Sequence, residues 1–309
     1  MATSDPAVLL GVRSGMSPWI DIARGAADEI RRSTGWRIIL HLTDAPLRPG
    51  GLIRGRIRLV GAICRMGGSI DQEALDRLGC PAVVVSNNGT PHRCPRVGVD
   101  ETAVGRLAAR HLLGLGLRRF SYANSPAHFS QERGRAFAET VIAAGCDCLI
   151  ADAHGEDDRR RFLARLTGLA QDGPIGLFAA NDGLATSLVH WLLEAGLPVP
   201  ERVAVLGVDD SADAQLAAPM PLSTIPLPGE RIGVEAAHLL IDLVGGAQPP
   251  ITPLLIPPAL VLTRRSTDLT AGLEPRVAAA LRFTAAHAHR NFAAAEVVAA
   301  AGCGRRTLE

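Results

Sequence analysis

The chain has 309 residues, enough for two domains, and its 47% hydrophobic content can fill a large buried core. Its formal net charge of +1 excludes the overall positive field of many nucleic-acid-binding proteins, so any basic footprint for DNA has to be local. Aromatic residues make up only 4% of the chain, which argues against a carbohydrate cleft lined mainly by aromatic rings.

The N-terminal stretch MATSDPAVLLGVRSG has no basic leader followed by an apolar run, so it does not have the pattern of a secretory signal. The most apolar later stretch, residues 238–262, is interrupted by five prolines, which excludes a membrane span. The six cysteines show none of the spacings of a zinc site. We therefore expect a cytoplasmic protein without metal, cofactor or membrane contact.

Short apolar runs alternate with helical patterns in the first part of the chain. Residues 20–33 place apolar side chains at helical spacing, and residues 101–119 predict a helix that Gly116 closes. The intervening runs are continuous and rich in β-branched residues, as strands of a parallel sheet covered on both faces are. They are AVLLGV (7–12), WRIILHL (36–42), LVGAICRM (59–66), PAVVVSN (81–87) and RVGVD (96–100).

A second series of strand and helix patterns begins at RFSYAN (119–124) and continues to about residue 258. Two series of this size predict an α/β fold with two lobes, each built on a doubly wound parallel sheet. We place the lobes at roughly residues 7–118 and 119–258. The pattern changes after Thr267, where a linker leads to a segment that is helical from Pro275 onward.

No motif in the chain assembles a catalytic site. The glycines of GLGLRR (114–119) follow a helix, whereas a dinucleotide-binding fingerprint requires a strand before its glycines. The sequence contains no G-x-S-x-G, no Walker loop and no H-E-x-x-H. We therefore expect a protein that is not an enzyme, although a fold can bring a carboxylate pair together without any motif.

Polar side chains follow the strands of the second series, at the sheet edge where open α/β folds bind ligands. Asn181 and Asp182 come directly after an apolar strand, as do Asp209 and Asp210, and Arg133 opens the first helix of the series. Carboxylates, an amide and a guanidinium suit a neutral polyol such as a sugar. Two alternatives stay open, because Asp182 or Asp210 could cap a helix and all 32 basic residues are arginine, which makes Arg133 a weak signal.

These segments resemble the sensor domain of the LacI/GalR repressors and the sugar-binding periplasmic proteins. The resemblance rests on FAANDGLATSL, VAVLGVDDS and LSTIPLPGERIGVEAAHLLI. It implies a sugar site that includes Arg133, Asn181, Asp182 and Asp209. The loop SGMSPWIDIARG lies where the family often places an aromatic ring against the sugar, which makes Trp19 a further candidate. Trp19 could equally hold the first helix against the sheet.

The C-terminal tail after IPPALVLTRRSTDL resembles the xylose-operon regulators, which join a LacI-like sensor to an AraC-type helix-turn-helix domain. We place the sensor at residues 1–268 and a truncated helix-turn-helix domain at 269–309. Pro275 suits a first helical position, and AAAEVVAAA (293–301) forms the second helix. One face of the first helix is expected to carry Val277, Leu281, Thr284 and Ala288. Arg305, Arg306 and Thr307 would begin the recognition helix that contacts DNA.

The resemblance implies a cytoplasmic, sugar-responsive transcription activator that acts on operator DNA as a homodimer. Its effector would be a pentose such as D-xylose. Two alternatives of other classes stay open at this point. One is a sugar receptor of a transport system, and the other is an enzyme that uses Asp182 and Asp209 as acid and base on a small polyol.

Overall fold

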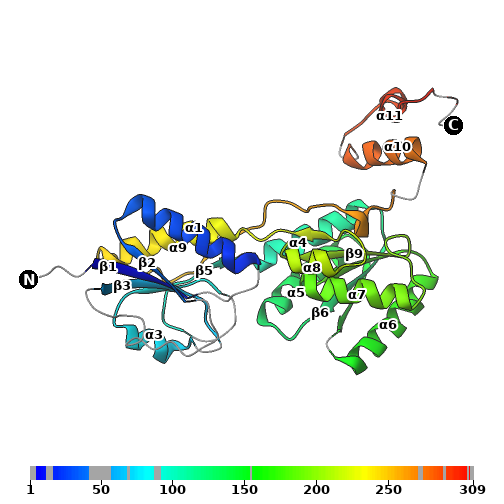
Figure 1. Cartoon of the computed structure of the whole chain (residues 1–309). Coiled ribbons are helices and arrows are strands. Elements are labelled where there is room, and N and C mark those ends of the chain that lie inside the picture. The colour runs from blue at the N-terminus through cyan, green and yellow to red at the C-terminus, as the bar shows by residue number, and fades with distance from the viewer. Residues whose placement is uncertain are drawn as a thin grey trace, which may run out of the picture.

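The structure, a computed structural model, describes residues 5–11, 17–41, 57–67, 70–86, 92–153, 155–270, 274–287, 290–304 and 306. Two α/β lobes lie side by side, and a pair of short C-terminal helices stands apart from them beside the second lobe (Figure 1). Among the described residues, no helix combines the length and apolar composition that crossing a bilayer requires.

The first lobe is a parallel sheet with strand order β2-β1-β3-β4, and a bridge between Val84 and Arg96 connects it to the parallel pair β5 and β11. Its strands are β1 (Asp5–Gly11), β2 (Arg37–His41), β3 (Ile57–Cys64), β4 (Ala82–Val84), β5 (Val97–Val99) and β11 (Leu254–Ile256). Its helices are α1 (Ser17–Ser33), α3 (Gln72–Leu78) and α9 (Gly229–Val244). The last five residues of both β1 and β3 are buried, as expected of strands covered by helices.

The second lobe is a five-stranded parallel sheet with order β10-β9-β8-β6-β7. Its strands are β6 (Arg119–Asn124), β7 (Asp147–Asp152), β8 (Ile175–Ala179), β9 (Val203–Val208) and β10 (Ser223–Ile225). Its helices are α4 (Glu101–Gly114), α5 (His128–Ala143), α6 (Glu156–Gln171), α7 (Asp182–Glu194) and α8 (Ala212–Ala217). Phe120, Tyr122, Phe137 and Phe178 form an aromatic cluster with ring centroids 5.1–6.4 Å apart, between the sheet and α5.

The division into two α/β lobes is confirmed, but the lobes are not the contiguous segments 7–118 and 119–258. Helix α4 packs on α5 in the second lobe, whereas α9 and β11 return to the first. The chain therefore crosses between the lobes three times: after β5, after β10 and after β11 (Figure 1). The spacing of apolar residues predicts that one face of a helix is buried, but it does not indicate which of the two sheets that face covers.

Helices α1 and α9 lie against each other so closely that glycine is required at their contact. A Cβ atom on Gly25 would lie 2.1 Å from the carbonyl oxygen of Glu230, and one on Gly233 would lie 2.1 Å from that of Ile22. Ile22, Ile30, Ile232 and Leu240 are buried in the core beside this contact. The close approach thus fixes α9 on the first lobe.

The segment after the second lobe forms a one-turn 3-10 helix, η1 (Arg265–Thr267), and then α10 (Pro275–Ala286) and α11 (Ala294–Ala300). Pro275 occupies the first turn as predicted, and the Glu274 carboxylate caps the helix by accepting from the backbone nitrogen of Arg276 at 3.0 Å. Phe283 stacks on His287 at 4.2 Å between ring centroids and meets Phe292 edge-on at 5.7 Å.

The helix face expected to carry Val277, Leu281 and Thr284 exists but is exposed, and Ala288 lies outside the described residues. Ala278 and Ala280 are buried instead.

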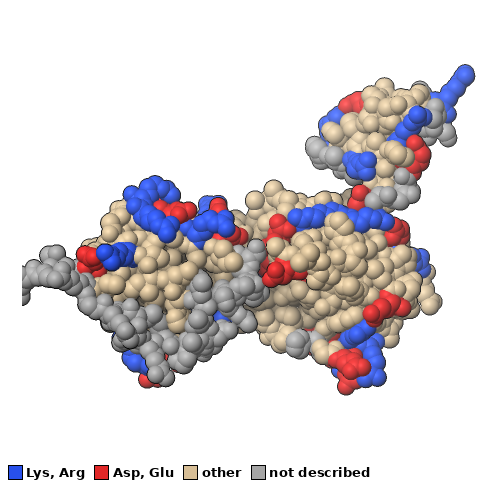
Figure 2. Space-filling model, viewed as in Figure 1, with Lys and Arg blue, Asp and Glu red and all other residues tan. Residues whose placement is uncertain are grey.

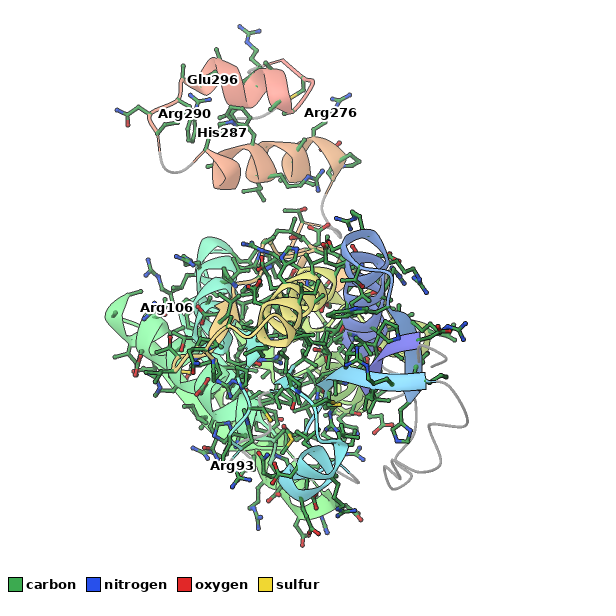
Figure 3. All side chains as sticks on the ribbon, turned by 90° about the vertical axis from the view of Figure 1, so that its left-hand side faces the viewer. Arg93, Arg106, Arg276, His287, Arg290 and Glu296 are labelled. Carbon is green, nitrogen blue, oxygen red and sulfur yellow. The ribbon has the colours of Figure 1, made fainter. Side chains whose placement is uncertain are left out.

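Figure 3 shows Arg276 at one end of α10, with Arg290 and His287 together at the other end. Figure 2 shows acidic and basic side chains mixed on the viewed face of both lobes. Arg290 pairs with Glu296 at 2.8 Å.

Replacing Gly233 by alanine is expected to lower the free energy of unfolding by about 1–3 kcal/mol, because the new methyl group would displace α1 from α9. Urea denaturation monitored by circular dichroism measures this. Gly168→Ala in α6 is the matched control, since nothing lies within 4 Å of its added Cβ. The control should stabilise the protein by about 0.5–1 kcal/mol, and equal destabilisation by both changes would contradict the close-packing argument.

Candidate functional site

A cavity of about 510 Å³ lies between the two lobes. Its wall combines residues at the carboxyl ends of strands with residues at the first turns of helices, where ligands of open α/β sheets bind. The first lobe contributes Pro18, Trp19, Ile22, Arg65, Val85, Ser86, Val99, Gly229 and Ile232. The second lobe contributes Glu101, Pro126, Ala127, His128, Phe129, Arg133, Asn181, Asp209 and Leu227.

Arg133 lies in this cavity, as predicted, but it is not a free cation. Its side chain is 3% exposed, and its Nε donates to Glu101 Oε2 at 2.5 Å while Nη1 donates to the carbonyl oxygen of Ala180 at 2.6 Å. Burial lowers the pKa of Arg133, but the carboxylates of Glu101 and Asp209 outweigh it and the net shift is upward. Arg133 therefore stays charged and compensated, with the ring of Phe129 centred 4.4 Å from its guanidinium carbon.

Glu101 is the residue that makes this arrangement possible. It begins α4 and is 4% exposed, and burial raises its pKa although Arg133 opposes the rise. Helices α4 and α5 can bring the two charges together because Gly105 has no side chain, since a Cβ there would lie 2.3 Å from the carbonyl oxygen of Arg133. Glu101 was not among the predicted site residues.

Asp209 also lines the cavity, as predicted, and its backbone is strained. Its φ of 116° and the φ of 52° at Asp210 lie where side chains other than glycine rarely occur. The backbone nitrogen of Asp209 donates to the Ile225 carbonyl at 3.0 Å, which holds the turn. No residue in the described part of the chain donates a hydrogen bond to its carboxylate, so that group can accept from a ligand.

Burial raises the pKa of Asp209 to about 7. Arg133 opposes this rise, whereas the neighbouring carboxylates of Asp182 and Glu101 add to it. The carboxylate therefore ionises near neutral pH. A ligand that donates hydroxyl hydrogens to it would favour the ionised form.

Asn181 lines the cavity and also caps a helix, a role that the sequence suggested for Asp182 and Asp210. Its Oδ1 accepts from the backbone nitrogen of Leu184 at 2.9 Å, which caps α7, and the residue lines the cavity as well. Its amide nitrogen has no hydrogen bond to any residue that the structure describes, so it remains available as a donor.

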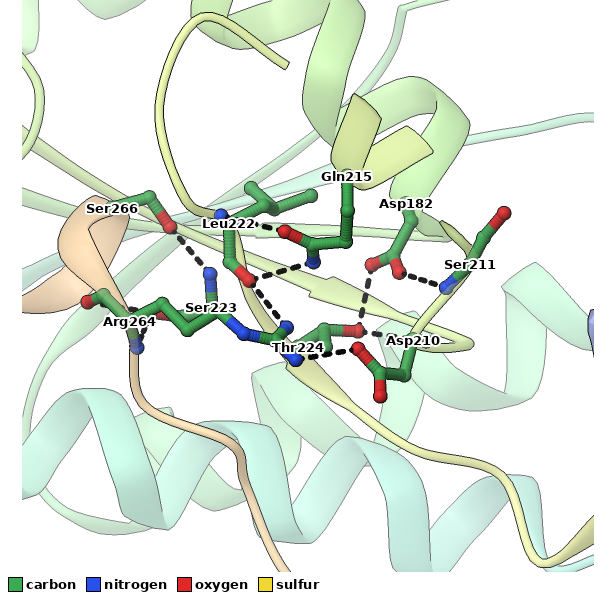
Figure 4. A network of polar contacts seen from close by, with 9 residues as sticks. All are labelled: Asp182, Asp210, Ser211, Gln215, Leu222, Ser223, Thr224, Arg264 and Ser266. Carbon is green, nitrogen blue, oxygen red and sulfur yellow. Dashed lines mark hydrogen bonds and ion pairs between the residues drawn. The ribbon is translucent and has the colours of Figure 1, made fainter. Parts of the chain in front are cut away.

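Asp182 does not line the cavity, which corrects the prediction for this residue. It is fully buried, its Oδ1 accepts from Thr224 Oγ1 at 2.7 Å, and its Oδ2 accepts from the backbone nitrogen of Ser211 at 2.9 Å (Figure 4). Burial raises its pKa to about 7, while these two hydrogen bonds lower it. A Cβ on Gly207 would lie 2.1 Å from Asp182 Oδ1, so glycine there makes room for the inward carboxylate.

The alternative that Asp182 or Asp210 caps a helix is also wrong. Asn181 rather than Asp182 caps α7, and Ser211 rather than Asp210 precedes α8. The Asp210 carboxylate instead forms an ion pair with Arg264 at 2.8 Å (Figure 4). Two neighbouring residues at a helix start point to different sides, so only one of each pair faces the cavity.

Trp19 lies where both of its suggested roles are possible. It packs against the core under α1 and also lines the cavity. The guanidinium carbon of Arg65 lies 5.2 Å from its ring centroid, which brings a second cation to the first-lobe wall. Arg65 comes directly after β3, so it too is a polar residue at a strand end. Such residues were considered as site candidates only in the second series of strands.

The predicted DNA-contacting residues fall almost entirely outside the described part of the chain. Arg305 and Thr307 lie outside it, and Arg306 is described only as one exposed helical position. The helix before them ends as predicted, with Gly302 in the left-handed region at φ 62°.

Residues 109–267, about half of the chain, match the model of the periplasmic binding protein-like domain. The xylose operon regulatory protein of Haemophilus influenzae is 29% identical over 203 residues, which are 62% of this chain and 52% of that protein. The ribose operon repressor of Bacillus subtilis is 29% identical over 228 residues, which are 72% of this chain and 69% of that protein. The chain thus spans about half the length of its xylose-operon relatives.

A solved structure of the xylose-binding transcription activator xylR has the same fold. It superposes with a TM-score of 0.71 at 23% identity and covers 100% of this chain and 82% of that one.

Asp209→Asn is expected to stabilise the protein increasingly as the pH rises from 5 to 7. In this window the folded protein keeps the Asp209 proton, because its pKa is near 7, whereas the unfolded chain has lost it at the ordinary value of 3.8. The free energy of unfolding therefore falls as the pH rises, by at most about 1.4 kcal/mol per pH unit. The asparagine removes that loss. Urea midpoints at pH 5, 6, 7 and 8 measure the difference between variant and parent.

The exposed Asp213→Asn in α8 is the control for this measurement, because it makes the same chemical change on the surface. A pH-independent difference for Asp209→Asn would show that the Asp209 carboxylate is not held in an unfavourable ionised state.

Proposed function

Because this chain belongs to the family of periplasmic binding protein-like domains, we propose that it is the sensor part of a transcription regulator that binds a small neutral sugar between its lobes. The observation that carries the proposal is the charge balance of the cavity. Arg133 is neutralised by Glu101 at 2.5 Å, which leaves the Asp209 carboxylate and the Asn181 amide as groups free to bind hydroxyls. The Arg133 cation therefore does not require a negative charge on the ligand.

The polar groups and the aromatic groups of the cavity have complementary uses. A sugar hydroxyl can donate to the Asp209 carboxylate, while a sugar oxygen can accept from the Asn181 amide. Trp19 on the first lobe and Phe129 on the second present ring surface to the apolar faces of a sugar ring. Because these residues come from both lobes, a bound sugar would favour the closed arrangement by contacts that the open arrangement cannot make.

We propose a pentose, with D-xylose as the first candidate, as the effector. Support comes from the xylose and ribose regulatory relatives and from the modest size of the cavity, about 510 Å³. An activator role, a homodimer and a cytoplasmic location belong to the same proposal. The enzyme alternative loses its support, because it needed Asp182 and Asp209 together and only Asp209 faces the cavity.

We further propose that residues 269–309 are the start of an AraC-type DNA-binding domain, with Arg305, Arg306 and Thr307 at its contact surface with operator DNA. Support comes from the helix pair α10 and α11, closed by Gly302, and from the basic residues Arg276, Arg282 and Arg306 around them. A chain of net charge +1 needs local basic residues in order to bind DNA.

Calorimetric titration with D-xylose, L-arabinose, D-ribose and D-glucose tests the sensor proposal. One pentose should bind more tightly than the others, and Asp209→Ala should weaken that binding at least 30-fold, about 2 kcal/mol, since it removes a charged hydrogen-bond acceptor. Asp213→Asn should bind like the parent. Absence of heat with all four sugars, for a chain that folds, would remove the sugar assignment.

A further inference from the structure

The strained turn that presents Asp209 is held from behind by a network of buried polar contacts (Figure 4). The backbone nitrogen of Asp210 donates to Thr224 Oγ1 at 3.2 Å, and that hydroxyl donates to Asp182 at 2.7 Å. Asp182 also accepts from the backbone nitrogen of Ser211 at 2.9 Å. Two successive residues with positive φ can persist only where surrounding contacts over-determine them, and these contacts do so.

Arg264 closes this network from a distant part of the sequence. Its Nη2 donates to Asp210 Oδ1 at 2.8 Å, and its Nη1 donates to the carbonyl oxygen of Leu222 at 2.9 Å. The two charged side chains are 29% and 33% exposed, so the pair is only partly screened by water. Arg264 therefore attaches the turn to the strand that follows α8.

Arg264 lies in the segment that leads from the sensor to α10, and this segment is bound tightly to the second lobe. Leu262 and Thr224 exchange backbone hydrogen bonds of 2.8 and 3.1 Å. Ser266 Oγ donates to the carbonyl oxygen of Val205 at 2.6 Å, and Thr267 Oγ1 lies 2.7 Å from Ser223 Oγ. The described segment continues to Thr270, and α10 begins at Pro275.

We propose that Arg264 is a positioning residue for Asp209, and that the Asp210–Arg264 ion pair couples a ligand at Asp209 to the segment that leads to α10. The inference rests on the proposed function, since it assigns the regulation of the same site. Asp209 and Asp210 are adjacent in one strained turn, so a ligand that reorients the first carboxylate shifts the backbone of the second. That shift changes the ion pair and with it the hold on residues 262–267.

A separate contact reaches the same segment from the other wall of the cavity. Helix α4 begins with Glu101, which pairs with Arg133, and farther along it His111 Nε2 lies 3.2 Å from Thr267 Oγ1. Movement of α4 with the Arg133 pair would therefore act on the segment at Thr267 as well. The cavity is thus connected to residues 262–267 by two contacts, and their coupling is a matter for measurement.

Deuterium exchange of the whole chain, with and without D-xylose, tests the proposal, together with calorimetry for affinity. In the parent, D-xylose should change the exchange of peptides covering residues 262–287. Arg264→Gln should abolish that change and weaken D-xylose binding by about 5- to 50-fold, because the turn that presents Asp209 is no longer held. Asp210→Asn, which tolerates the left-handed backbone, should behave in the same way and guards against a folding defect of the arginine variant.

Arg265→Gln is the matched control. Arg265 is the next residue and pairs with Glu201 at 2.7 Å, but neither side chain reaches the Asp209 turn. It should leave both affinity and the sugar-dependent exchange unchanged. Parent-like affinity and parent-like exchange in Arg264→Gln and Asp210→Asn would overturn the proposal.

A ligand-free arm separates this inference from the sugar assignment. Asp209→Ala alone should change the exchange of residues 262–287, and it should cause no further change in the Arg264→Gln background. Independent, additive effects would overturn the coupling. If none of the sugars binds the parent, the sensor proposal fails, but this double-mutant comparison still decides whether Asp209 and Arg264 are coupled.

Discussion

The buried ion pair between Arg133 and Glu101 is the interaction on which the cavity depends. Each charge is almost fully removed from water, so each is tolerable only because the other lies 2.5 Å away. Removing one partner of such a pair typically costs about 3–5 kcal/mol, because the remaining charge stays buried and uncompensated. The pair also fixes α4 against α5, with Gly105 providing the space, and a ligand does not have to balance the charge of Arg133.

The other residues of the cavity could be predicted from the sequence only in part. The alternation of strands and helices predicted an α/β fold, and polar residues after apolar strands predicted Arg133, Asn181 and Asp209 at one sheet edge. The rule does not say which of two adjacent polar residues faces outward. Asn181 caps α7 from the cavity side while Asp182 turns inward to Thr224, and that choice depends on the space that Gly207 leaves.

The lobe boundaries and two residues of the cavity wall, Glu101 and Arg65, were not predicted correctly for a similar reason. The apolar face of α9 is equally suitable for either sheet in the sequence, and its glycine contact with α1 and its packing on the first-lobe strands assign it to the first lobe. In the sequence, Glu101 is an ordinary acidic residue in the first turn of a helix, and only the structure shows its ion pair with Arg133. Arg65 is one of 32 arginines in a chain without lysine, so its residue type alone carried little information. These assignments depend on contacts between segments far apart in the chain.

The three crossings between the lobes have a consequence for how the chain folds as it is synthesised. Five strands of the first lobe, β1 to β5, are complete when residue 99 has been made. The strand β11 and α9, one of the two helices that cover their core, follow only after residue 228. All five strands of the second lobe, residues 119–225, leave the ribosome before α9 does. The second lobe can therefore fold first, while part of an apolar face of the N-terminal sheet is still uncovered. Exposed apolar surface of this kind favours chaperone binding or aggregation.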